Sequence, residues 1–216
     1  MATLRTWGGA AALFEALAYA IGILTMATVL SPGDTSGWDA GRKLAFVMQN
    51  KGLFQAWMLV VYILGGIGIA VLSVALHARL KAHAPDLMAV ATGLGLVWAG
   101  LVVASGMVAN IGLDTVSALQ ADFPERATTA WIAIGAVQNG LGGGIEIVGG
   151  LWVFLVSLAS LRTRTLPRAL DVLGLLVGTA GLLSAIPSLG DLSAVFGLAQ
   201  IPWFAWLGTW SLRQAD

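Results

Sequence analysis

Two glutamates, Glu15 and Glu146, are the residues of this sequence best suited to chemistry. Each lies inside a stretch that is otherwise free of Asp, Glu, Lys and Arg, residues 6–33 and 127–161. A charged side chain at the centre of a membrane helix costs at least about 2.5 kcal/mol, so it faces the bundle interior or water and marks a functional site by default. No Lys or Arg lies at matching depth, so we expect neutral acids unless water or a cation reaches them. This chemistry suits a proton carrier or a site for a cationic ligand.

A purely structural role for both glutamates stays open. A neutral glutamate inside a helical bundle can simply hydrogen-bond a neighbouring helix. The polar residues at suitable depth, which would serve either as such partners or as parts of a ligand site, are Tyr19, Asn110, Gln138, Asn139 and Gln200.

Three tryptophans, Trp203, Trp206 and Trp210, follow one face of the last apolar stretch, next to Gln200 and Pro202. Trp210 fits the aromatic belt at a membrane surface, whereas Trp203 and Trp206 fall near mid-depth. These two could form an aromatic wall for a lipophilic ligand. Contact with lipid or with other helices is the commoner role of such residues.

Other kinds of site lack their residues. The chain has no cysteine, and its two histidines, His77 and His83, lie in a basic connection without a third ligand nearby. Serine nucleophile, phosphate-loop and metalloprotease signatures do not occur. We therefore expect no metal site, no cofactor and no evident catalytic set. The 11 basic and 11 acidic residues balance, which gives no indication of a nucleic-acid partner.

The elements that position these residues are expected to be membrane helices. The chain is 58% hydrophobic and 10% charged, against about 25% charged residues in an ordinary soluble domain. Six apolar stretches are long enough to cross a bilayer, which takes about 20 residues. We place the spans at residues 8–30, 53–76, 86–113, 139–161, 172–187 and 192–212. The sequence predicts an all-α bundle that forms one domain over residues 1–216.

The stretch 127–161 is too long for one straight span, so it must bend, tilt or begin outside the membrane. The glycine cluster 140–144 is the expected break, because clustered glycines weaken a helix. Gly142, Glu146 and Gly150 would then share one helical face that packs closely on another helix.

The connections indicate an orientation. Residues 38–50 show helical spacing of apolar residues and predict a short amphipathic helix at the outer surface. Basic residues are more frequent on the side that holds both termini, which the positive-inside rule makes the cytoplasm. That side carries Arg5, Arg79, Lys81, Arg162, Arg164, Arg168 and Arg213, and the other carries Arg42, Lys43, Lys51 and Arg126. In this topology Glu15 lies in the inner half of the membrane and Glu146 in the outer half, as two separate polar stations.

The last quarter of the chain resembles a bacterial family of six-span membrane proteins of unknown function. The resemblance lies in Arg-Thr-Arg-Thr-Leu-Pro-Arg-Ala-Leu-Asp-Val-Leu-Gly-Leu-Leu-Val-Gly from Arg162, and in Ile-Pro-Trp-Phe-Ala-Trp-Leu-Gly from Ile201. Family members carry an acidic residue after the Ile-Pro pair, where this chain has Ala205 or Trp206. The resemblance implies the architecture and no activity. The expected location is a bacterial inner membrane.

We expect an integral membrane protein that binds or moves a small ligand or a proton through Glu15 and Glu146. The alternative is a non-catalytic accessory subunit of a larger membrane complex, whose small-residue faces, such as Gly174 and Gly178, contact other helices. An intramembrane enzyme ranks third, because no nucleophile or base is evident. The expected partners are membrane lipid and, for the accessory role, other membrane subunits or a second copy.

Overall fold

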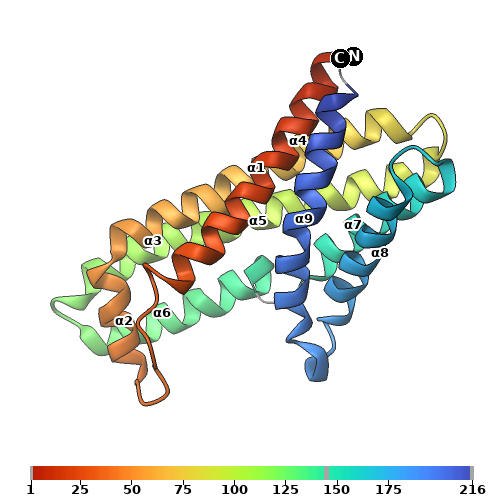
Figure 1. Cartoon of the computed structure of the whole chain (residues 1–216). Coiled ribbons are helices and arrows are strands. Elements are labelled where there is room, and N and C mark those ends of the chain that lie inside the picture. The colour runs from red at the N-terminus through yellow and green to blue at the C-terminus, as the bar shows by residue number, and fades with distance from the viewer. Residues whose placement is uncertain (1, 144–145, 215–216) are drawn as a thin grey trace.

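The computed structural model is entirely helical (Figure 1) and describes residues 2–143 and 146–214. Its elements are α1 (Ala2–Ala27), α2 (Ala40–Gln49), α3 (Lys51–Met58), η1 (Leu59–Leu64), α4 (Gly65–Leu80), α5 (Pro85–Gln120), α6 (Pro124–Gln138), η2 (Asn139–Gly143), α7 (Ile147–Thr163), α8 (Arg168–Leu183), η3 (Pro187–Leu189) and α9 (Leu192–Arg213). Both η1 and η2 are short π-helical segments. The prediction of an all-α bundle is confirmed.

Five helices are long and apolar enough to span a membrane. They cover Leu4–Thr28, Lys51–Leu80, Pro85–Gln120, Pro124–Thr163 and Leu192–Arg213. The predicted span at 172–187 is represented by α8, which has only 16 residues and therefore falls short of the length a crossing needs. A multi-pass membrane architecture follows from these lengths and compositions, and a sixth crossing stays a prediction.

The fourth span differs from its prediction at its start. A helix begins at Pro124, so the 15-residue α6 precedes the predicted start at 139. Proline suits the first helical position because its missing N–H is unpaired there in any case. The glycine cluster therefore interrupts this stretch and does not begin it.

The interruption itself is confirmed at Gly142. Its φ of 155° lies in the region that favours glycine, and the surrounding η2 segment is π-helical. Glu146 is the N-cap of α7, with φ −96° and ψ 27°. The prediction that Gly142, Glu146 and Gly150 share one helical face is wrong, because the backbone is not helical at Gly142.

The predicted amphipathic helix exists as α2. The Asp39 side chain accepts a hydrogen bond of 2.7 Å from the backbone N–H of Arg42 and so caps the helix. The Arg42 guanidinium stacks 4.4 Å from the centroid of the Trp38 ring. α2 packs on α3 and α6. Its position at a membrane surface stays a prediction.

Glycines set the antiparallel packing of α1 against α4 and α9. Gly8 of α1 lies against Ala75 of α4, and Gly22 lies against Val61. On the other side of α1, Gly9 lies against the backbone of Gly208 in α9. Backbones approach closely where no side chain separates them, so α1 is held between α4 and α9.

The pair α7 and α8 packs in the same way. A Cβ at Gly150 would lie 2.8 Å from the backbone of Gly181 and 2.9 Å from the Gly178 carbonyl oxygen. Gly174 and Gly178 contact α7 of the same chain, at Ser157 and Phe154. The small-residue motif of α8 is therefore occupied within the bundle.

Candidate functional site

Glu15 lies near the middle of α1 and is fully buried. Its carboxylate points at a glycine-lined part of α4. A Cβ at Gly68 would collide with Oε1, and a Cβ at Gly65 would lie 3.4 Å from Oε2. Neither carboxylate oxygen has a hydrogen-bond partner among the described residues. The expected structural role, a hydrogen bond to a neighbouring helix, is therefore not seen for this side chain.

Two tyrosines lie in the region of Glu15 and Glu146. Tyr19 follows Glu15 by one turn of α1 and lies within electrostatic range of Glu15, Glu146 and Tyr62. Tyr62, in η1, lies within electrostatic range of Glu146, and the nearby Gln138 amide donates to the Met58 Sδ at 3.7 Å. π-Helical turns such as η1 occur frequently at functional sites. These four side chains and Gln138 form what we call the polar centre.

Glu146 lies where the backbone is interrupted between α6 and α7. Its backbone N–H points at the hydroxyl of buried Ser184 in α8, at 3.4 Å. Its side chain is half-buried and makes no capping hydrogen bond. Irregular backbone at membrane depth is tolerated where it is buried in protein or lines a water-filled cavity.

Neighbouring glycines locate both glutamates relative to α5. Gly66 of α4, beside the glycines that receive Glu15, contacts Ala99 and Val103 of α5. Gly149 of α7, three residues after Glu146, contacts Trp98 of the same α5 stretch. Both glutamates therefore lie near the same part of α5. Their placement in opposite halves of the membrane stays a prediction.

Gln200 joins this region from α9. One cavity is lined by Tyr19 and Ile23 of α1 and by Ala194 and Leu198 of α9. This part of α9 therefore runs alongside the second half of α1. Gln200 is fully buried, and its amide nitrogen and oxygen have no partner among the residues that the structure describes. It lies between the levels of Glu15 and Tyr19 in this packing.

Two of the predicted amide residues lie elsewhere. Asn110 pairs with Gln55 through two hydrogen bonds. The Asn110 side-chain amide donates to the Gln55 backbone carbonyl oxygen at 3.4 Å, and the Gln55 side-chain amide donates to the Asn110 backbone carbonyl oxygen at 3.3 Å. This pair lies about 14 Å along α5 from the level of Glu15, at 1.5 Å per residue. Asn139 has an exposed side chain at the start of η2. Neither belongs to the polar centre.

The tryptophans of α9 have different surroundings in the fold. Trp203 is 1% exposed and packs edge-to-face against Trp152 with ring centroids 5.9 Å apart, within an aromatic core that includes Trp98 and Phe196. Trp206 is 41% exposed on the outer surface of the bundle. Trp203 therefore packs the core, Trp206 faces outward, and no shared aromatic wall forms.

The sequence did not predict Tyr62 of the polar centre or the two glycines beside Glu15. Gly65 and Gly68 make room for the Glu15 carboxylate, and Tyr62 lies in η1, directly before them in the chain. The glycine cluster at 65–68 was a signal for close approach of another group. Nothing in the local pattern around Tyr62 indicates the π-helical turn that presents it.

Asp171 is a further buried acid that the sequence did not suggest. It lies in the first turn of α8, outside the five helices long enough to span, and is 1% exposed. Burial raises the pKa of its carboxyl to about 6, and the neighbouring Ser160 hydroxyl opposes part of that rise. Ser160 also accepts a 3.0 Å hydrogen bond from the Leu166 N–H. These contacts join the ends of α7 and α8.

The polar centre combines acids and phenol hydroxyls without a basic partner. The ion pair seen within the described ranges joins Lys51 and Asp114 at 2.7 Å, beside Gln55 and away from Glu15. No group of three His, Asp or Glu side chains suited to a metal occurs in residues 2–143 and 146–214. The arrangement can exchange protons or accept hydrogen bonds from a cationic or hydroxylated group.

Comparison with known proteins gives one family and no nearer relative. A family model described as a domain of unknown function, DUF4386, matches residues 7–212. No curated protein and no solved structure matches the chain. The match extends the resemblance of the last quarter over nearly the whole length. The chain therefore belongs to the DUF4386 family.

Proposed function

We propose that this membrane protein binds or moves a small ligand or a proton through the polar centre at Glu15 and Glu146. The observation that carries the proposal is the fully buried Glu15 carboxylate, which has no hydrogen-bond partner among the described residues. A buried polar group without a partner costs about 1–3 kcal/mol, so a protein that retains one gains something other than stability from it.

The surroundings of Glu15 support a role for both glutamates together. Tyr19 lies within electrostatic range of each of them, and Glu146 is the N-cap of α7, after the helix interruption at Gly142. Interrupted helices near mid-membrane form substrate and ion sites in many transporters. The accessory-subunit alternative loses its best candidate surface, because Gly174 and Gly178 are occupied by α7.

We further propose six crossings with both termini on the cytoplasmic side of a bacterial inner membrane. α1 begins and α9 ends at the same end of the bundle (Figure 1), which requires an even number of crossings. Five helices qualify by length, and α8 with residues 184–190 supplies the sixth. The excess of basic residues on the side of the termini favours the cytoplasm. Membrane lipid is the expected partner.

Proton movement tests the function. The purified protein is reconstituted in liposomes that contain a pH-sensitive dye, and a membrane potential is imposed. We expect proton flux with the wild type and a fall to the protein-free level with Glu15→Gln and Glu146→Gln combined, because the amides cannot carry a proton. Glu125→Gln, an exposed glutamate in the first turn of α6, is the matched control. Equal flux from the wild type and the double variant would contradict proton movement through these residues.

A further inference from the structure

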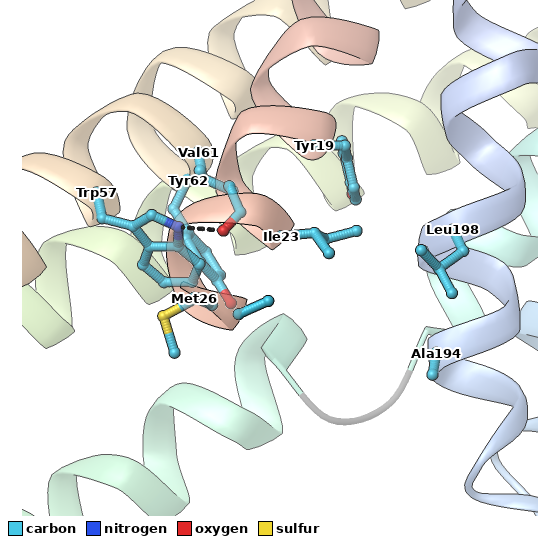
Figure 2. Close-up of a pocket in the computed structure, with 11 residues that line it drawn as sticks. Tyr19, Ile23, Met26, Trp57, Val61, Tyr62, Ala194 and Leu198 are labelled. Atoms are coloured by element: carbon cyan, nitrogen blue, oxygen red, sulfur yellow. Dashed lines mark hydrogen bonds between the residues drawn. The ribbon is translucent and has the colours of Figure 1, made fainter. Parts of the chain in front are cut away.

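A cavity of about 540 Å³ lies between α1, α9 and the α3–η1 helix, beside the polar centre (Figure 2). Such a volume is typical of sites for small organic molecules. Its lining residues are Tyr19, Gly22, Ile23, Met26, Ala27, Trp57, Val61, Tyr62, Ala194, Gly197 and Leu198. The cavity opens sideways, because Ile23, Met26 and Leu198 are 39%, 37% and 55% exposed. Since α1 and α9 both qualify as spanning helices, this opening faces lipid in a membrane.

The lining is almost wholly apolar, and its polar side chains are those of Tyr19, Trp57 and Tyr62. The Trp57 indole N–H already donates to the Gly22 carbonyl oxygen at 3.0 Å, which ties the walls of the cavity together. The tyrosine hydroxyls of Tyr19 and Tyr62 remain as polar groups of the lining. No charged side chain lines the cavity among the described residues.

The cavity adjoins Glu15 through the same tyrosines. Tyr19 follows Glu15 by one turn of α1, and Tyr62 precedes by three residues Gly65, where a Cβ would lie 3.4 Å from the Glu15 Oε2. A molecule in the cavity therefore has apolar walls around most of its surface and the Glu15 carboxylate beyond the tyrosines. Charge complementarity favours a cationic head over an anionic one, because this acid is close by and no Lys or Arg lines the cavity among the described residues.

We propose that the cavity binds a lipophilic amine, with its apolar body between α1 and α9 and its amine head at Tyr19 and Tyr62, next to Glu15 and Glu146. The amine enters from the lipid through the sideways opening. This inference rests on the proposed function and names the class of ligand that the polar centre takes.

Filling the cavity tests the proposal directly. A Cβ at Gly197 meets no atom within 4 Å, so Gly197→Phe fills the cavity without displacing α9. Gly100 is the matched control, because a Cβ there also meets nothing within 4 Å and the residue lines a separate groove between α4 and α5. Ala194→Phe, one turn away in α9, repeats the test if Gly197→Phe does not give a monodisperse protein.

The probe is radiolabelled dodecylamine, titrated onto protein in phosphatidylcholine nanodiscs, with partitioning into empty nanodiscs subtracted. We expect saturable binding to the wild type and to Gly100→Phe, and about a tenfold or larger loss of affinity in Gly197→Phe. Dodecanol, which has the same chain without the charge, should compete weakly. Equal affinity of Gly197→Phe and Gly100→Phe, or no saturable binding to the wild type, would overturn the inference.

The variant with Glu15→Gln and Glu146→Gln separates this inference from the proposed function. Loss of dodecylamine binding in the glutamine variant and in Gly197→Phe would support the cavity and the proposed function together. Full binding in the glutamine variant with loss in Gly197→Phe would support the cavity and overturn the polar centre. Loss in the glutamine variant with full binding in Gly197→Phe would overturn the cavity and leave the polar centre.

Discussion

Gly150→Val is expected to cause the largest loss of stability of any single substitution considered for this chain. A Cβ at this position would lie 2.8 Å from backbone atoms of Gly181 and Leu182 and 2.9 Å from the Gly178 carbonyl oxygen. Backbone cannot rotate away as a flexible side chain can, so α7 and α8 must move apart. Overpacking of a core costs about 1–3 kcal/mol and occasionally more. The folded yield after detergent extraction and the midpoint of unfolding in sodium dodecyl sulfate measure the effect.

The control for this prediction is Gly100→Val. A Cβ at Gly100 meets nothing within 4 Å, and the glycine lies within α5. Gly100→Val therefore changes the helix propensity as Gly150→Val does, but it causes no collision. Equal unfolding midpoints for the two variants would show that α7 and α8 are not held at this distance.

Glu15→Met is expected to stabilise the protein while it abolishes function. The carboxylate is buried without a hydrogen-bond partner among the described residues, and methionine fills a similar volume with apolar atoms. Removal of an unpaired buried polar group should raise the free energy of unfolding by about 1 kcal/mol or more. The same substitution removes a carboxylate of the polar centre, so dodecylamine binding and proton flux should fall.

Glu125→Met is the matched control, because Glu125 is exposed in the first turn of α6. Its unfolding midpoint should stay equal or fall slightly, since an acidic residue favours a helix N-terminus. A lower midpoint for Glu15→Met than for the wild type would show that Glu15 holds the bundle together, and the functional interpretation would lose its main support.

The sequence predicted the helices well because apolar length is a local property. It located the interruption at the glycine cluster and singled out Glu15, whose burial the structure bears out. It did not predict that Glu15 and Glu146 lie near the same part of α5. That relation depends on which residues of α4, α5 and α7 contact each other, and no single stretch encodes those contacts.

The tryptophans and the motif of α8 illustrate the same limit. Spacing alone places Trp203 and Trp206 on one side of a helix, but the neighbours of α9 decide which of them is covered. Gly174 and Gly178 were equally suited to a partner helix or to the chain itself, and the fold uses them against α7. Tyr62 and the glycines at 65 and 68 acquire their meaning from Glu15 and Glu146, which are distant in the sequence.

The most direct test of a single polar centre is a double-mutant cycle between Glu15→Gln and Glu146→Gln. Unfolding in sodium dodecyl sulfate is measured for the wild type, both single variants and the double variant. Residues that share a network show interaction energies of about 0.5 kcal/mol or more, whereas distant sites add within about 0.3–0.5 kcal/mol. One centre joined by Tyr19 predicts an interaction energy above that limit. Additive effects would contradict it and return the two glutamates to separate stations.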